Sequence, residues 1–463
     1  MLSDHDRELI DNAAKSLLEN PGVRVEDEQL VSALLSRGAK PGGGPMDVRF
    51  PRAMVEEYLG MAPESFPIAD RRGNIWTVTP EGGPLFWTGA ALFYSDREGF
   101  RHIKTKDLGN FAKVIDSLSE VDAVVGTSLE DVKPSHRDFV GLRIMAENTS
   151  KHLRTLSFTP KGGEAMVEMG KVLAGERNLR DYPVFSVGFT AHGPLRWTSL
   201  ALGLFKATAG HGVPCTVNGE PMSGATAPVT VAGTVTVGTA EILSGIVINQ
   251  VMEQGRPCFF NLGFAHVMDM RSGFAVTGGP ENIMLAVAGA EMARYYHLPS
   301  VSWMCTDSLH FDSQNALEKA MAALAHAQAK VSVIWGVGQL ESEKTISPVQ
   351  AVIDNEIVGM TRKYLLGFEV NDETISLDEI RKVGITGDYL QSEKTFKYFR
   401  GSVFEPRFLV RKQRSSAGER DTLKHRAVDY VDNIIAEEKE PILSEEQKRE
   451  LKRIENKYRE LIP

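Results

Sequence analysis

The feature that most constrains the fold of this chain is a repeat of apolar, strand-like runs, each followed by a helical stretch. The runs recur at steps of 29 to 44 residues and begin near Val121, His152, Val184, Val213, Pro257, Pro299 and Val331. Near-continuous apolar strands that alternate with helices are typical of a parallel sheet covered by helices. Seven such units predict a (β/α)8 TIM barrel, with the eighth strand expected at Gly384–Gln391. No G-x-G-x-x-G motif follows the first run, so a dinucleotide-binding sheet gains no support.

The segments on either side of the predicted barrel have different patterns. Residues 1–106 combine helical periodicity with short alternating runs and glycine-rich turns, which predict an N-terminal helical and small antiparallel β extension. Residues 107–392 are expected to form the barrel. Residues 393–463 are rich in charge and predict a helical C-terminal extension. Such a charged extension is typical of a solvated surface or a subunit contact, so we expect a homo-oligomer.

Composition excludes several classes of protein. The net charge of −9 over 463 residues argues against a nucleic-acid-binding surface. The N-terminus is acidic and amphipathic, unlike a signal peptide, and no apolar run reaches the ~20 residues of a membrane helix. These features predict a soluble, cytoplasmic protein that does not engage a membrane. The three cysteines, Cys215, Cys258 and Cys305, match no metal motif and are expected to be buried thiols.

Polar side chains gather where the predicted strands end, most densely in the stretch Pro257–Asp312. In a barrel of this kind the chemistry takes place at the carboxyl ends of the strands. The ends carry no nucleophile–base–orienter set and no spacing typical of a metal site, so no metal is expected. The candidates for acid–base catalysis are His310, Asp307 and Glu220. The candidates for substrate binding are Arg271, His266, Asn218, Phe264, Phe189, His192 and Trp335.

This mixture of aromatic residues, histidines and one arginine suits a cation that also carries an anion. Aromatic faces attract a quaternary ammonium through the ring quadrupole. Arg271, with His266 or His310, could bind a carboxylate through charge-assisted hydrogen bonds. Two alternatives stay open, because aromatic residues on barrel strands are usually core and Asp269 could pair with Arg271 to hold their loop.

Several motifs resemble the trimethylamine methyltransferase (MttB-type) superfamily. They occur in the family's order and cover roughly residues 108–393. The motifs are the run Asn218–Gln250, MDMRSG (Met268–Gly273), GGPE (Gly278–Glu281), HLPS (His297–Ser300), TDSLHFD (Thr306–Asp312) and GQLES (Gly338–Ser342). The resemblance implies a (β/α)8 barrel that moves a methyl group from an amine to the cobalt of a small corrinoid protein.

One departure from the family pattern points to a substrate class. The trimethylamine branch carries pyrrolysine near the segment equivalent to Thr306–Asp312, whereas this chain contains only the twenty standard residues. It therefore resembles the non-pyrrolysine branch, whose activities include demethylation of glycine betaine to dimethylglycine. The resemblance implies no tightly bound cofactor, because the cobalt corrinoid is carried by the partner protein. A quaternary nitrogen leaves as a neutral amine, which would explain the missing nucleophile.

Two other classes of function remain as alternatives. The first is a barrel lyase or hydrolase that uses Asp307, His310 and Glu220 as acid–base groups and needs no partner protein. The second is a non-catalytic protein that binds betaine or acts as a scaffold. The number of polar residues at the strand ends exceeds what binding alone requires, which favours an enzyme.

Overall fold

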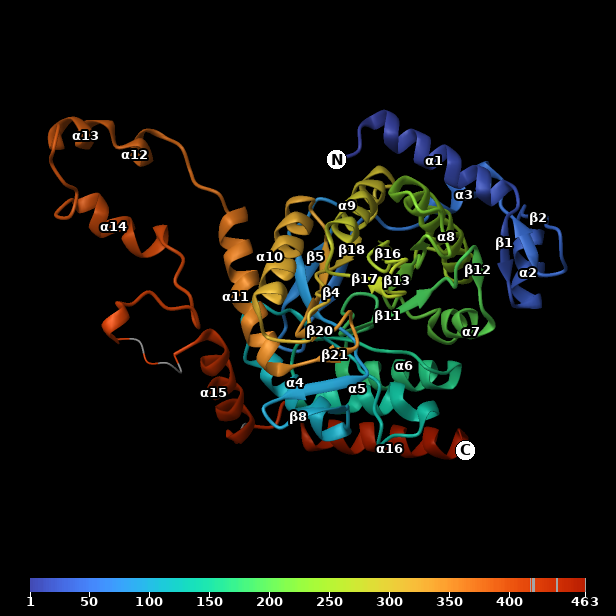
Figure 1. Cartoon of the computed structure of the whole chain (residues 1–463). Coiled ribbons are helices and arrows are strands. Elements are labelled where there is room, and N and C mark those ends of the chain that lie inside the picture. The colour runs from blue at the N-terminus through green and yellow to red at the C-terminus, as the bar shows by residue number, and fades with distance from the viewer. Residues whose placement is uncertain (417, 419–420, 439, 463) are drawn as a thin grey trace.

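The computed structural model describes residues 1–416, 418, 421–438 and 440–462, and its centre is a closed barrel of eight parallel strands (Figure 1). This confirms the predicted fold class. Seven strands begin where the apolar runs were expected. In chain order the barrel strands are β6 (Leu85–Thr88), β9 (Ala123–Val125), β10 (His152–Arg154), β11 (Phe185–Thr190), β13 (Cys215–Asn218), β15 (Cys258–Asn261), β18 (Ser300–Trp303) and β19 (Val333–Val337).

The expected eighth strand at Gly384–Gln391 is wrong. Those residues form no strand and are exposed to solvent. The missing strand is β6, which pairs with β19 through Val333 and Leu85 and with β9 through Trp87 and Ala123. Strand β6 is a four-residue apolar run among glycine-rich turns. Its sequence pattern is therefore the same as that of the neighbouring hairpin strands, and it was not recognised as a barrel strand. The barrel therefore begins inside the segment expected to be an N-terminal extension.

A helix follows each barrel strand and covers the outside of the barrel. Most of these helices begin at a Ser, Thr or Asp whose side chain accepts a hydrogen bond from the first turn, such as Thr159, Thr230 and Ser347. The helices are α4 (Thr105–Asp116), α5 (Arg137–Asn148), α6 (Pro160–Ala174), α7 (Ser199–Thr208), α8 (Val231–Met252), α9 (Pro280–Tyr295), α10 (Ser313–Gln328) and α11 (Pro348–Leu365).

The N-terminal segment covers α8 from outside (Figure 1). Helices α1 (Asp4–Glu19) and α3 (Arg52–Leu59) pack on α8, while α2 (Glu28–Ser36) lies beside a small sheet. That sheet has the order β12 (Arg196–Trp197), β1 (Val23–Val25), β3 (Asp47–Arg49) and β2 (Lys40–Pro41). In the described part of the chain α8 alone is long and apolar enough to cross a membrane, but 72% of its apolar window is buried within the protein.

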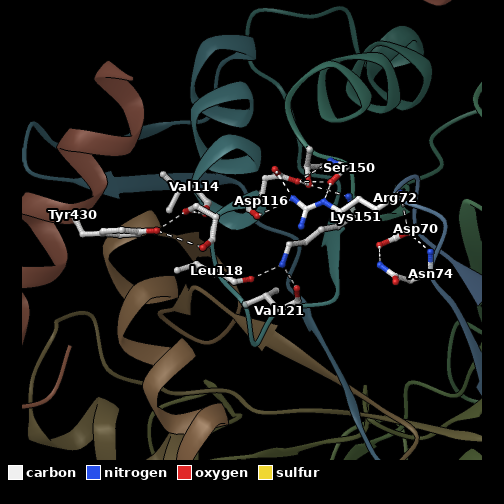
Figure 2. A network of polar contacts seen from close by, with 12 residues as sticks. Asp70, Arg72, Asn74, Val114, Asp116, Leu118, Val121, Ser150, Lys151 and Tyr430 are labelled. Carbon is white, nitrogen blue, oxygen red and sulfur yellow. Dashed lines mark hydrogen bonds and ion pairs between the residues drawn. The ribbon is translucent and has the colours of Figure 1, made fainter. Parts of the chain in front are cut away.

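The hairpin of β4 (Phe66–Ala69) and β5 (Ile75–Val78) closes the end of the barrel where the strands begin. Phe66 packs edge-on against Phe259 inside the barrel, with ring centroids 4.9 Å apart. Beside the hairpin, Asp116 accepts hydrogen bonds from the Ser150 amide at 2.7 Å and from Arg72 at 2.9 Å (Figure 2). Lys151 donates to the carbonyls of Leu118 and Val121, which precede β9. Because the β4–β5 hairpin closes this end of the barrel, a ligand must enter from the opposite end, where the strands have their carboxyl ends.

Small sheets surround that open end. One has the order β20 (Gln339–Leu340), β21 (Thr345–Ile346), β7 (Phe93–Asp96) and β8 (Gly99–His102). The other contains β14 (Met222–Ser223), β16 (His266–Met268) and β17 (Ala275–Val276). All three cysteines are free and buried, as expected.

The C-terminal extension packs on the outside of the barrel at two places. Helix α15 (Leu423–Ala436) lies on α4 and α11, and Tyr430 donates a hydrogen bond of 2.9 Å to Ser117 Oγ (Figure 2). Helix α16 (Glu445–Leu461) lies on α5 and α6, where Lys457 pairs with Glu168 at 2.7 Å. Between α11 and α15 the chain forms a projecting arm with α12 (Asp372–Ile375), α13 (Leu377–Val383) and α14 (Glu393–Ser402), followed by the short turn η2 (Arg414–Ser416).

Candidate active site

A cavity of about 390 Å³ opens at the carboxyl ends of the barrel strands. Every barrel strand, or the loop that follows it, contributes to the wall. One lining residue from each, in chain order, is Ala91, Val125, Arg154, Thr190, Asn218, Phe264, Trp303 and Trp335. This is the position at which (β/α)8 enzymes place their chemistry.

One wall of the cavity is aromatic. The Phe264 ring lies 4.8 Å from Trp303 and 5.6 Å from Trp335, centroid to centroid, and the two indoles are 5.2 Å apart. Their tilted and edge-on arrangement leaves ring faces of different orientation around one space. Such a wall can hold a quaternary ammonium through cation–π attraction, worth ~0.5–2 kcal/mol per ring.

Arg154 is a buried cation in the same cavity. Its side chain extends from the end of β10, is 5% exposed, and lies over the Trp335 ring at 5.1 Å. The guanidinium donates to the Thr155 carbonyl and, at 3.4 Å, to Thr216 Oγ1, whereas Nε has no partner. It forms no ion pair with any carboxylate of the described residues. Burial lowers the pKa of Arg154 to about 9, so it stays charged at neutral pH.

The neighbouring strand leaves room for this guanidinium. A Cβ atom at Gly188 of β11 would lie 2.1 Å from Arg154 Nη2 and 2.3 Å from Thr216 Oγ1. Any larger residue there would displace the arginine. Three polar atoms of lining residues are buried without a hydrogen-bond partner: Arg154 Nε, Ser157 Oγ and Trp335 Nε1. Buried donors of this kind usually have a partner, so a ligand with an anionic group could supply it.

Glu343 is the acidic residue of the cavity wall. Glu341, Ser342 and Glu343 all have left-handed backbone conformations, with φ of 56°, 50° and 74°. Non-glycine residues in this region cost of order 1–3 kcal/mol each and gather at functional sites. The loop is held by hydrogen bonds from the Glu341 amide to Ser308 O and from the Ser342 amide to Thr306 O, both 2.9 Å.

The strained loop places the Glu343 carboxyl beside His266 and Cys305. Oε1 lies 3.6 Å from His266 Nε2 and 3.6 Å from Cys305 Sγ. Burial, with the nearby charges of Glu220 and Asp307, raises the pKa of Glu343 to about 8. Burial also lowers the pKa of His266, so the imidazole is neutral at pH 7. The side chain of Glu343 is 21% exposed, which leaves it accessible to a ligand in the cavity.

The structure brings three of the predicted binding residues together in the cavity wall: Asn218, Phe264 and Trp335. Asn218 donates a hydrogen bond to Thr190 Oγ1 at 3.0 Å and accepts one from Asn261 at 2.7 Å. His266 reaches the wall indirectly, through its contact with Glu343.

The other predicted binding residues lie elsewhere. The Arg271 side chain is 95% exposed and contacts Asp269 at 3.4 Å, so it holds its own loop. Phe189 points outward from the barrel and stacks on Phe205 of α7 at 3.8 Å. His192 is an exposed loop residue outside the lining. None of these three residues lines the cavity.

The three predicted catalytic residues are also outside the lining. His310 is exposed. Glu220 lies near Glu241, and desolvation with that like charge raises the pKa of Glu220 to about 7. Asp307 accepts four hydrogen bonds, at 2.6 to 3.1 Å, from the Thr277 amide and hydroxyl, the Gly278 amide and the Ser342 hydroxyl. The Asp307 carboxylate therefore joins its own loop to the loop of Thr277 and to the loop that carries Ser342 and Glu343.

Asp307→Asn should therefore act mainly on stability. An amide can accept from fewer of the four donors, and leaving buried donors without partners costs ~1–3 kcal/mol each. We expect the free energy of unfolding in denaturant to fall by about that amount. His310→Ala, at an exposed position three residues further along, should change it by less than about 0.5 kcal/mol. A rate loss beyond about 10⁴-fold in a stably folded Asp307→Asn protein would contradict the structural role.

Three residues of the cavity wall were not predicted from the sequence: Arg154, Trp303 and Glu343. The signal for Arg154 was present, because a charged residue inside the apolar run His152–Leu156 is unusual for a buried parallel strand. Trp303 was hidden in an apolar strand. Glu343 directly follows the GQLES motif, but no glycine marks the left-handed backbone that turns it inward.

The fold and the cavity are those of a (β/α)8 barrel with a pocket of ligand size at the carboxyl ends of its strands. Over residues 1–461 the chain matches the family model described as trimethylamine methyltransferase (MTTB). This chain belongs to that family and is a methyltransferase.

Several relatives are similar over most of their length. A trimethylamine methyltransferase of Methanosarcina thermophila is 30% identical, over 85% of this chain and 84% of that protein. A glycine betaine methyltransferase of Desulfitobacterium hafniense (strain Y51) is 28% identical, over 96% of this chain and 94% of that one. The solved monomethylamine methyltransferase of Methanosarcina barkeri is similar in fold, with a TM-score of 0.56 and 13% identity, covering all of this chain and 88% of that one.

Proposed function

We propose that the protein demethylates a small quaternary ammonium carboxylate, with glycine betaine as the favoured substrate, and transfers the methyl group to the Co(I) of a corrinoid protein. The observation that carries the proposal is the cavity itself. It combines a buried arginine that has no carboxylate partner among the described residues with an aromatic wall. A zwitterion with a carboxylate and a trimethylammonium group complements both features.

In this proposal each part of the cavity has a separate task. Arg154, with the unpartnered donors of Ser157 and Trp335, binds the carboxylate. Trp303, Trp335 and Phe264 surround the methylated nitrogen. Glu343 acts as the counter-ion of that nitrogen when it ionises. The balance of charge then favours a zwitterion over a simple cation, which Arg154 would repel.

The proposed reaction requires the protein mainly to position the substrate. Co(I) attacks a methyl carbon in line, the new bond is carbon–cobalt, and the carbon–nitrogen electron pair leaves with a neutral tertiary amine. No proton has to be transferred. Side chains that fix the nitrogen and exclude water supply the catalysis. The two ends of the substrate are bound, and the methyl groups are presented to the open end of the barrel.

The relatives support this reading at the level of substrate class. One of them is named a glycine betaine methyltransferase, although several others are named trimethylamine methyltransferases. The buried arginine favours glycine betaine in this proposal, because trimethylamine has no carboxylate for Arg154. The lyase or hydrolase alternative has less support, since Asp307, His310 and Glu220 all lie outside the cavity lining.

The test compares two methyl donors. Purified protein is mixed with a Co(I) corrinoid protein and either glycine betaine or trimethylamine, and formation of methyl-cobalt is followed by absorbance. We expect methylation with glycine betaine and none above background with trimethylamine. Faster methylation from trimethylamine would overturn the proposed substrate. Turnover of a substrate by the protein alone would favour the lyase or hydrolase.

A further inference from the structure

The arm, defined as residues 366–403, is the part of the chain with the most exposed apolar surface. It leaves the C-terminal end of α11 and projects away from the barrel (Figure 1). None of its residues is buried, and α12, α13 and α14 have no buried side chain. Phe368, Ile385, Leu390 and Phe396 are 82% to 96% exposed. Monomeric proteins rarely expose apolar surface so densely.

Polar contacts give the arm a defined shape. Tyr398 of α14 donates a hydrogen bond of 2.9 Å to Glu373 of α12, and Lys397 pairs with the same carboxylate at 3.1 Å. At the base of the arm Lys363 donates to the Gly401 carbonyl at 2.7 Å, which joins the outgoing and returning chain. The arm is thus a preformed hairpin that lacks a core of its own.

An apolar surface that could receive such an arm lies on the same chain. The acceptor face is formed by Leu317 and Met321 of α10 and by Met360 and Tyr364 of α11, each pair one helical turn apart. All four side chains are 52% to 71% exposed. The two helices are neighbours, and Gln328 of α10 donates to the Tyr364 hydroxyl of α11 at 3.2 Å.

We propose that the arm of one copy packs on the acceptor face of a second copy, and that the exchange is reciprocal, giving a homodimer. The apolar area that the arm exposes is sufficient for a stable interface. A buried aromatic side chain removes about 150–250 Å² from water, and the arm exposes five aromatic and eight aliphatic side chains. A stable interface needs only ~800 Å² from each partner. Reciprocal contact between an arm and a face is self-complementary, as a twofold dimer requires.

A corrinoid protein is a less suitable occupant of the arm. Barrel helices run opposite to their strands, so the end of α11 lies at the end of the barrel that the β4–β5 hairpin closes. The arm therefore starts at the end opposite the cavity, whereas a methyl acceptor has to reach the cavity. A partner that binds and leaves at each turnover also typically uses a smaller and more polar interface.

The test is the mass of the full-length protein in solution at micromolar concentration. We expect twice the mass of a single chain. The donor variant Phe396→Asp/Phe399→Asp and the acceptor variant Leu317→Asp/Met321→Asp should each raise the dissociation constant at least about 100-fold and give monomers. Leu9→Asp, on the exposed side of α1, changes an apolar residue that is 55% exposed and lies off these surfaces, and it should leave the dimer intact.

Mixing the two variants tests directly whether an arm packs on the acceptor face of another copy. The donor variant keeps an intact acceptor face and the acceptor variant keeps an intact arm, so one of the two junctions can form. We expect a mixed dimer, weaker than the native one, and unchanged melting temperatures of the barrel. A monomeric native protein, a dimer that persists in both variants, or an arm variant that loses only binding to the corrinoid protein would each overturn the proposal.

Discussion

Arg154→Met should weaken binding of glycine betaine by roughly 30- to 4,000-fold, the equivalent of ~2–5 kcal/mol. The arginine is buried in the cavity, and the structure gives it hydrogen bonds only to neutral groups. A carboxylate ligand would be its missing counter-ion. Methionine keeps much of the side-chain volume and leaves the carboxylate desolvated without a partner. Calorimetry or equilibrium dialysis measures the change directly.

Choline makes the prediction specific to the carboxylate. It has the same trimethylammonium group and no carboxylate, so loss of the Arg154 charge should strengthen its binding by removing a like charge. The matched control is Arg271→Met, which removes an exposed arginine outside the cavity and should alter neither ligand. Equal losses for glycine betaine and choline in Arg154→Met would mean that the arginine only shapes the cavity.

The barrel was predictable because most of its strands are buried on both faces. Burial on the inside by the core and on the outside by helices requires near-continuous apolar sequence, and this pattern located seven strands. This pattern did not predict β6, since Leu85–Thr88 is a short apolar run between turn signals. Its assignment depends on contacts with β19 and β9, which are distant in sequence.

The site was less predictable, because strand-end position does not fix side-chain direction. Neighbouring residues of a strand point to opposite faces, so Phe189 turns to the helices while the backbone of Gly188 faces Arg154. An arginine in a strand-end loop predicts an anion-binding group, but Arg271 pairs with Asp269 two residues away. The amides of the left-handed turn at 341–343 donate hydrogen bonds to the carbonyls of Thr306 and Ser308, and no local sequence signal reveals these contacts.

Glu343 should make binding of glycine betaine depend on pH. With its pKa raised to about 8, the carboxyl is mostly protonated at pH 7 in the free protein. An ammonium group beside it would favour the ionised form, so binding should release about one proton. Affinity should then rise with pH, by up to about tenfold per unit, and level off above about pH 8. The proton count follows from calorimetry in buffers of different ionisation enthalpy.

Glu343→Gln tests this assignment, because glutamine is neutral at every pH. We expect the variant to release no proton, to lose the pH dependence between pH 6 and 8, and to bind about 100-fold more weakly than the native protein at pH 8. The other groups facing Glu343 are His266, Cys305, Asp307, Glu220 and, across the cavity, Arg154. Proton release that persists in the variant would assign the titration to one of them.

The pH dependence of stability gives an independent check on the same carboxyl. A raised pKa in the folded state means that the folded protein holds the proton more tightly than the unfolded chain does. Glu343 should therefore lower the stability of the ligand-free protein progressively as pH rises from about 4.5 to about 8, and Glu343→Gln should remove that loss. Glu341→Gln is the matched control, since Glu341 lies in the same loop but accepts its hydrogen bond from Thr345 at 2.6 Å. If both variants behave alike in stability and in proton release, the cavity has no titrating counter-ion at Glu343, and the ammonium group is held by the aromatic wall alone.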